Sequence, residues 1–310
     1  MFSVVFPGQG SQFVGMGRKL YDEFGYVKDL FKKADDILGF PLSRIILEGS
    51  KEKLDSTENT QPSIFLVSYS IYKVIKKETK IDLSKAKFFA GHSLGEYSAL
   101  ASSESLVFDQ AIKLLNLRGK AMQSAVPKGE GGMLAVLGIE IDKIKNILYE
   151  NKSNYECFIA NDNSNGQIVI SGKNKDLEFL MSDLKKLSIK NIKLPVSAPF
   201  HCKLMNTATE TMRNVILNTE FKKPNNLIVS NVTSEEVSDP LNIKELLIKQ
   251  IESPVRWRES IIYMANKGVR KFIEIGPGKV LSGLIKRIDK NLKIININDI
   301  DDIKNLNIND

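Results

Sequence analysis

The 310-residue sequence contains only two cysteines, Cys157 and Cys202, and only two histidines, His92 and His201. Two cysteines exclude the disulfide framework of a small secreted protein and favour a reducing compartment, so we expect a cytoplasmic protein. No apolar run approaches the ~18 to 20 residues that a membrane helix needs. The N-terminal segment MFSVVFPGQGSQ has no basic residues before its apolar run, which argues against a signal or transit peptide.

Negative charge is in the minority. The chain has 44 lysines and arginines against 37 aspartates and glutamates, a net charge of +7. This excess favours an acidic partner. Nucleic acid is one candidate, but the sequence has no basic motif interleaved with aromatic residues and no zinc-ligand spacing. An acidic protein partner fits the charge equally well.

The segment FFAGHSLGEYSALA (Phe88–Ala101) carries the first functional signal. Its GHSLG portion fits the G-x-S-x-G pattern, in which a serine sits on a sharp strand-to-helix turn with its hydroxyl exposed. Glycine permits strand and helix to approach closely at such a turn because it has no Cβ. A glycine-rich turn with an incidental serine has the same pattern, but the apolar run before it and the small residues after it suit the strand and the helix. Ser93 is therefore the candidate nucleophile.

A serine hydroxyl needs an adjacent general base, and histidine is the usual one. His92 directly precedes Ser93, so its side chain should diverge from the serine on a strained turn. The remaining histidine is His201, in the segment SAPFHCKLM. A purely structural histidine is the alternative, but the need of Ser93 for a base favours a catalytic His201.

Two polar side chains are predicted to point inward from helices. In a helix over Phe108–Val126, Arg118 lies in the middle of an apolar stripe, with Asn116 on the opposite face. A buried arginine is costly unless a carboxylate meets it. It could form an internal ion pair, reach the protein edge, or clamp a substrate carboxylate. In a helix over Ile243–Ile251, Gln250 also lies in the apolar stripe and could orient a buried group.

The order of predicted elements divides the chain. Strands and helices alternate in the first and last parts, which is typical of a parallel sheet covered by helices. From Gly131 the predicted order is strand, helix, strand, strand, helix, strand, the ferredoxin-like arrangement. We therefore predict an α/β fold with a discontinuous large domain, 1–127 and 198–310, and an inserted subdomain, 128–197.

The same patterns predict the bounds of further elements. Helices are predicted over Leu20–Gly39, Gln61–Thr79 and Lys175–Ser188, and strands over Tyr155–Asn161, Ile192–Ser197 and Asn226–Val232. Taken as helical, the segment Asp183–Lys193 presents Lys185, Lys186, Lys190 and Lys193 as a candidate docking face for an acidic protein, although a solvated face explains them equally well. The polar C-terminal end is predicted to be loosely ordered.

A set of motifs runs along the chain in this order: FPGQGSQFVGMG, TQPSIFLVSYS, GHSLGEYSAL, LRGKAMQ, GGMLAVLG, VSAPFHCKLM, IKQIESPVRW and EIGPGKVLSGLIKR. Together, these motifs resemble those of the malonyl-CoA:acyl-carrier-protein transacylase family. The resemblance covers Phe2 to about Arg287. It implies an α/β-hydrolase-like parallel-sheet domain with an inserted ferredoxin-like subdomain, and transfer of malonate from malonyl-CoA to acyl carrier protein for type II fatty-acid synthesis.

The resemblance also implies a role for each matching residue. It makes Ser93 the nucleophile, His201 its base and Arg118 the ligand of the malonyl carboxylate. The other implied positions are the backbone N–H groups of Gln9 and Leu94 as the oxyanion hole, the Gln250 carbonyl as the support of His201, His92 and Asn161 in the pocket lining, and Phe200 where related domains exclude branched acyl groups. The implied chemistry uses malonyl-CoA and phosphopantetheinylated acyl carrier protein, without a metal or redox cofactor.

Three other functions stay open on the sequence. An esterase or thioesterase shares the serine turn, but it has no evident use for an inward Arg118 and usually carries its histidine near the chain end. A non-catalytic module that binds carrier protein would need neither Ser93 nor His201. An acyltransferase of polyketide synthesis cannot be separated from one of fatty-acid synthesis. We expect a monomer that binds neither nucleic acid nor membrane.

Overall fold

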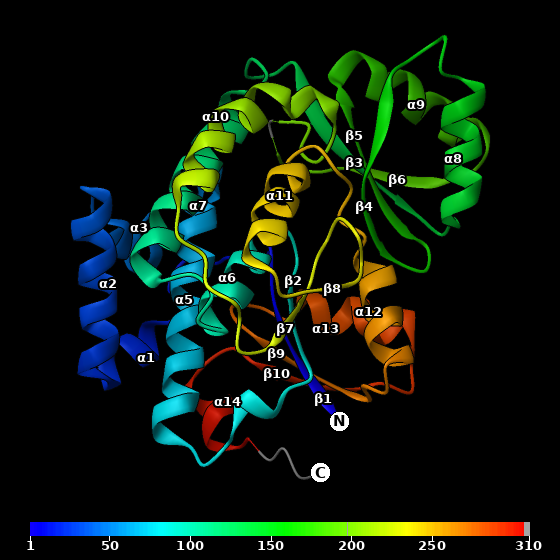
Figure 1. The fold of residues 1–310 in the computed structure, drawn as a ribbon. Coiled ribbons are helices and arrows are strands. Elements are labelled where there is room, and N and C mark those ends of the chain that lie inside the picture. The colour runs from blue at the N-terminus through cyan, green and yellow to red at the C-terminus, as the bar shows by residue number, and fades with distance from the viewer. Residues whose placement is uncertain (197, 307–310) are drawn as a thin grey trace.

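Figure 1 shows a central sheet between layers of helices and, beside it, a smaller sheet with its own helices. The computed structural model describes residues 1–196 and 198–306. The central sheet has the strand order β10-β9-β1-β2-β7-β8; β8 is antiparallel to β7 and the other neighbours are parallel. Its strands are β1 (Phe2–Phe6), β2 (Phe88–Gly91), β7 (Leu227–Val229), β8 (Glu236–Val237), β9 (Lys271–Ile275) and β10 (Lys293–Ile297).

Helices cover both faces of this sheet. Val4 and Phe89 lie in the core shared with α5, α6 and α7, whereas Val5 and Phe88 lie in the core shared with α12 and α13. Burial on both faces explains why the strands are continuous apolar runs in the sequence. The helices outside the smaller unit are α1 (Arg18–Glu23), α2 (Gly25–Leu38), α3 (Leu42–Glu48), α4 (Lys51–Asp55), α5 (Thr57–Glu78), η1 (Leu83–Lys85), α6 (Gly95–Ser102), α7 (Phe108–Ser124), η2 (Lys203–Met205), α10 (Asn206–Asn218), α11 (Pro240–Gln250), α12 (Trp257–Asn266), α13 (Val280–Ile288) and α14 (Ile300–Lys304).

The smaller unit is one continuous stretch of chain. Its elements are β3 (Gly131–Leu137), α8 (Ile141–Glu150), β4 (Cys157–Ser164), β5 (Gln167–Lys173), α9 (Asn174–Lys186) and β6 (Lys190–Lys193). Its sheet is antiparallel with the order β4-β5-β3-β6. The predicted α/β fold class, with a parallel sheet and a separate antiparallel one, is confirmed. The domain boundaries stay a prediction; Ser197, the last residue of the predicted subdomain, and residues 307–310 lie outside the described residues.

The predicted helix over Leu20–Gly39 is wrong as a single helix. Phe24 has extended backbone angles, φ −113° and ψ 115°, and separates α1 from α2. Periodicity alone missed this break because apolar residues continue at helical spacing across it.

The prediction that Asn116 faces away from the core is also wrong. Asn116 is 5 % exposed, and its Nδ2 donates to the Glu58 carbonyl at 3.0 Å. Pro62 lies inside α5, four residues after Glu58, and has no N–H to donate to that carbonyl. The Asn116 amide replaces the missing helical hydrogen bond, so a polar side chain is required on a buried face.

Three element boundaries in the second half differ from the prediction. Strand β4 continues past Asn161, the predicted end, to Ser164, and β7 covers only part of Asn226–Val232. Helix α9 ends at Lys186 and β6 begins at Lys190, so the four lysines of the candidate docking face do not share one helix. The C-terminal tail contains α14, whose capping box uses Asp299 and Asp302. The capping box satisfies backbone N–H groups at the start of α14, which explains why this polar segment forms a helix.

Candidate active site

Ser93 lies on the turn between β2 and α6. Its backbone has φ 54°, a left-handed value that is strained for a residue with a Cβ. A Cβ on Gly91 would lie 1.9 Å from the Gly95 carbonyl carbon, and a Cβ on Gly95 would lie 2.3 Å from the Phe6 carbonyl oxygen. The glycines therefore allow α6 to start directly against the ends of β1 and β2, with Ser93 at the turn.

His201 lies beside Ser93. Its Nε2 is 2.8 Å from Ser93 Oγ, and its Nδ1 is 2.9 Å from the backbone carbonyl oxygen of Gln250. A carbonyl only accepts, so Nδ1 carries the proton and Nε2 presents its lone pair to the serine. Burial, with a contribution from the Arg118 cation, lowers the pKa of His201 to about 3. The imidazole is therefore neutral at physiological pH and able to accept a proton.

Arg118 extends from α7 to the same serine. It is fully buried, and its Nη2 donates to Ser93 Oγ at 3.2 Å and to Gln250 Oε1 at 2.9 Å. Its Nη1 donates to Gln61 Oε1 at 2.8 Å. No ion pair includes Arg118 in the described parts of the chain, so the internal salt bridge considered from the sequence is not formed. Burial lowers the pKa of Arg118, and an incoming carboxylate would supply the missing partner.

A pocket of about 160 Å³ opens over Ser93. It brings together nearly all the residues singled out in the sequence; those in its lining are Gln9, His92, Ser93, Leu94, Arg118, Asn161, Phe200 and His201. Gln250 lies behind this lining, fully buried. His92 diverges from Ser93 as expected: its Nε2 is 2.8 Å from Asn163 Oδ1 and its ring packs against Trp257. The geometry permits proton transfer from Ser93 to His201 with a cation beside the reacting oxygen.

Sequence reasoning missed the polar residues that surround this centre. Asn231 Oδ1 accepts from the Ser93 backbone N–H at 2.7 Å, and Asn231 Nδ2 donates to the Gly91 carbonyl at 2.7 Å. Glu96, 2 % exposed, accepts from Asn231 N–H at 3.0 Å and from Gln250 Nε2 at 2.8 Å. Asn231 follows β7 at the carboxyl edge of the sheet, where functional residues of open α/β sheets gather. That position could have identified Asn231 from the sequence as a candidate site residue. Glu96 was detectable as a charge in a helix of small and apolar residues.

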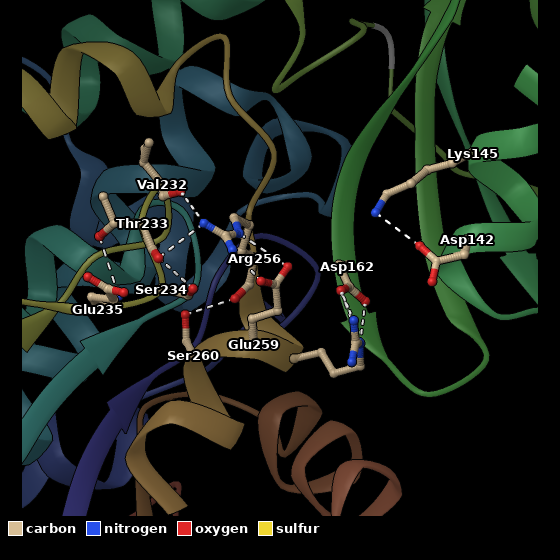
Figure 2. A network of polar contacts seen from close by, with 11 residues as sticks. Asp142, Lys145, Asp162, Val232, Thr233, Ser234, Glu235, Arg256, Glu259 and Ser260 are labelled. Carbon is tan, nitrogen blue, oxygen red and sulfur yellow. Dashed lines mark hydrogen bonds and ion pairs between the residues drawn. The ribbon is translucent and has the colours of Figure 1, made fainter. Parts of the chain in front are cut away.

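The smaller unit is joined to the active site along β4. Val255 N–H donates to the Ala160 carbonyl at 2.8 Å, and Asp162 N–H donates to the Val255 carbonyl at 3.0 Å. Figure 2 shows Asp162 on β4 facing an arginine side chain, with Arg256 between Glu259 and the carbonyls of the turn at Val232. Arg258 Nε donates to both Asp162 oxygens at 3.0 Å. These contacts hold β4 beside the segment that follows Gln250.

Replacing Arg258 by alanine is expected to lower the free energy of unfolding by ~3 kcal/mol, because breaking a buried pair leaves an uncompensated charge. The Asp162 side chain is 2 % exposed and that of Arg258 is 22 % exposed. Urea unfolding measures the change. Adding Asp162→Asn to Arg258→Ala should restore part of the loss, since the unpaired charge is gone.

The matched control for this pair is Glu259→Ala, which breaks the ion pair with Arg256. Those two side chains are 35 % and 38 % exposed. An exposed pair contributes only ~0 to 1 kcal/mol. If Arg258→Ala cost no more than Glu259→Ala, the Asp162–Arg258 pair would not be what attaches β4.

Within residues 1–196 and 198–306, no cluster of three or more His, Cys, Asp or Glu side chains has the arrangement of a metal site. Among the same residues, no helix has the length and apolar character needed to span a bilayer.

Comparison with known proteins assigns the family. A family model described as "Acyl transferase domain" matches residues 3–303. The match continues past Arg287, where we expected the resemblance to end, through β10 and most of α14. The chain is 42 % identical over 297 residues to "Malonyl CoA-acyl carrier protein transacylase" of Bacillus subtilis (strain 168), covering 95 % of this chain and 92 % of that protein.

Solved structures agree with this assignment. The acyl-carrier-protein-S-malonyltransferase of Bartonella henselae has a TM-score of 0.95 and 40 % identity, covering 98 % of this chain and 97 % of that one. The malonyl-transacylase PlMCAT, solved with the type II PKS acyl-carrier protein AntF, has a TM-score of 0.95 and 37 % identity, covering 100 % and 99 %. The chain therefore belongs to the acyl transferase family, in the group of malonyl-CoA:acyl-carrier-protein transacylases, and is an acyltransferase.

Proposed function

We propose that this enzyme transfers malonate from malonyl-CoA to the phosphopantetheine thiol of an acyl carrier protein, for type II fatty-acid synthesis. The observation that carries the proposal is the 3.2 Å contact between the buried Arg118 guanidinium and Ser93 Oγ. It puts a fixed cation beside the nucleophile, where the free carboxylate of a malonyl thioester would lie. A neutral ester would leave that cation unpaired, which argues against an ordinary esterase.

The first half-reaction forms a malonyl ester on Ser93. His201 Nε2 accepts the serine proton while Ser93 Oγ attacks the thioester carbonyl. The backbone N–H groups of Gln9 and Leu94 stabilise the oxyanion, and such a donor contributes roughly 3 to 4 kcal/mol at comparable sites. The tetrahedral intermediate collapses, its C–S bond breaks, and CoA leaves as a thiol with the proton from His201. The Gln250 carbonyl holds Nδ1–H throughout and replaces the acid of a triad.

The second half-reaction runs the same chemistry in reverse. His201 Nε2 takes the proton of the phosphopantetheine thiol, whose sulfur attacks the malonyl ester. The C–O bond to Ser93 breaks, and the proton returns to Ser93 Oγ. Arg118 holds the malonyl carboxylate in both halves. His92, Asn161 and Phe200 shape the pocket, and Phe200 restricts branching beside the thioester. Neither half-reaction changes an oxidation state, so the proposed mechanism needs no redox cofactor. It needs no metal either, because the backbone N–H groups stabilise the oxyanion and His201 moves the proton.

The acceptor is an acidic carrier protein in this proposal, in keeping with the net charge of +7. The structure of PlMCAT with AntF is a precedent for such a complex, and it makes a polyketide carrier protein the second candidate acceptor. We propose that the enzyme acts as a cytoplasmic monomer.

Intact mass spectrometry tests the proposal directly. Malonyl-CoA alone should add one malonyl group to the enzyme, and carrier protein bearing phosphopantetheine should then remove it and gain the same mass. Carrier protein without phosphopantetheine is the control. Release of free malonate without any mass gain on the carrier protein would indicate a thioesterase and contradict the proposal.

A further inference from the structure

Glu96 is a buried carboxylate that the proposed mechanism does not use. It lies on α6, three residues after the nucleophile, and is 2 % exposed. Its Oε2 accepts two hydrogen bonds, from the Asn231 N–H at 3.0 Å and from Gln250 Nε2 at 2.8 Å. No ion pair within 4.0 Å includes Glu96 among the described residues. A carboxylate in this position needs an explanation, because burial without a cation is costly.

The side-chain amide of Gln250 lies between Glu96 and Arg118. Its Nε2 donates to Glu96, and its Oε1 accepts from Arg118 Nη2 at 2.9 Å. An amide has one donor end and one acceptor end, whereas an ionised carboxylate only accepts. Glu96 therefore accepts from the donor end of the amide, together with the Ser93 carbonyl and Asn231 Oδ1, and the acceptor end faces the guanidinium.

The same amide connects the rest of the reaction centre. Its Nε2 also lies 3.2 Å from the Ser93 carbonyl oxygen, and the main-chain carbonyl of Gln250 accepts from His201 Nδ1. The Arg118 guanidinium is thus held between the amide oxygens of Gln250 and Gln61. An amide flip at Gln250 would place an N–H against Arg118 and remove one of these two acceptors.

We propose that Glu96 is a positioning residue: its ionised carboxylate orients the Gln250 amide and, through that amide, holds and counterbalances the Arg118 guanidinium for the carboxylate of the substrate. This inference rests on the proposed malonyl transfer. The two charges act through one polarised amide in a medium of low dielectric, where such a chain of hydrogen bonds is strengthened. Glu96 itself does not touch the substrate.

The protonation state of Glu96 gives the proposal a measurable consequence. The charged or titratable groups facing it are Arg118 from α7 and its neighbour Tyr97 on α6, and His201 reaches it only through Gln250. Burial raises the pKa of Glu96 to about 7, and the hydrogen bonds from Asn231 and Gln250 oppose that rise. Below this pH the protonated acid no longer offers the amide a charged acceptor, so the contribution of Glu96 to the orientation of the amide is lost.

The test is Glu96→Gln in the full-length enzyme, which keeps the size but offers either end of an amide to Gln250. The kcat/KM for malonyl-CoA should fall about 2- to 150-fold, the range of coupling between residues in one network. Acetyl-CoA should be affected less, because it has no carboxylate for Arg118. In an Arg118→Ala background, Glu96→Gln should cause no further loss of malonyl transfer. Equal losses for the two substrates, or additive losses in the double variant, would overturn the proposal.

The matched control is Glu274→Gln, which removes another buried carboxylate. Glu274 accepts from Leu281 N–H at 3.0 Å and from Ser282 N–H at 2.8 Å, and none of these hydrogen bonds involves Ser93, Arg118 or Gln250. It should lower stability without changing the malonyl-to-acetyl ratio.

The wild type alone provides a second test that does not depend on folding of a variant. From about pH 8 to about pH 6 its malonyl-to-acetyl ratio of kcat/KM should fall, since His201 does not titrate there. A flat ratio over that range would contradict the role of Glu96. Failure of malonyl-CoA to label the wild type would instead contradict the proposed function itself.

Discussion

Ser93→Ala is expected to remove the covalent malonyl enzyme completely and to lower kcat for transfer by roughly 10⁶-fold, as loss of a catalytic serine does in a serine protease. The physical reason is that, in the proposed mechanism, the hydroxyl at 2.8 Å from His201 Nε2 is the group that bonds to the acyl carbon. The fold should tolerate the change because alanine keeps the Cβ at this strained turn. Intact mass after incubation with malonyl-CoA and the rate of carrier-protein loading measure the effect.

The control for this variant is His92→Ala, on the adjacent residue of the same turn. His92 bonds to Asn163 rather than to Ser93, so its loss should slow transfer far less and leave one malonyl group on the enzyme. A malonyl label that persists in Ser93→Ala would assign the nucleophile elsewhere. Cys202 is the next nucleophilic side chain, although burial raises the pKa of its thiol to about 12 and makes it a poor one.

Arg118→Ala is expected to lower kcat/KM for malonyl-CoA roughly 30- to 3,000-fold while sparing or raising acetyl transfer. Truncating one partner of a buried charge pair costs ~2 to 5 kcal/mol, mostly through the charge that stays unpaired. In the variant that charge is the malonyl carboxylate. An acetyl group loses no partner, and the poorly solvated cation that opposes it is gone. The measurement is kcat/KM for malonyl-CoA and acetyl-CoA with both proteins.

Arg118→Lys is the graded control. An ammonium keeps the charge but loses the planar fork that contacts Ser93, Gln250 and Gln61 at once, so malonyl transfer should be intermediate. If Arg118→Ala lowered both substrates by the same factor, Arg118 would be structural, and the carboxylate clamp would have to be sought at another residue of the pocket.

The sequence by itself determined the features that depend on neighbouring residues. The serine turn follows from two glycines and an apolar run within a few positions, and the structure has it between β2 and α6. Helical periodicity placed Arg118 and Gln250 on buried faces, where both are fully buried. The count of histidines left His201 as the candidate base, and it lies next to Ser93. Local pattern was sufficient for the turn and for the two helix faces because each depends only on residues that are close together in the chain.

The tertiary structure alone decided how these features meet. The inward Asn116 results from a contact that no periodicity describes, and the break at Phe24 lies within an uninterrupted apolar spacing. The polar network behind Ser93 joins residues 61, 96, 118, 231 and 250, which come from different elements. They are adjacent only because β7 pairs with β2, α7 packs on α5 and α6, and α10 packs against both α7 and α11. Each buried polar atom there needs a partner, and the partner is set by sheet order and helix packing rather than by spacing in the chain. The sequence therefore indicated the candidate nucleophile, base and carboxylate ligand, whereas the residues that hold the three together emerged only from the fold.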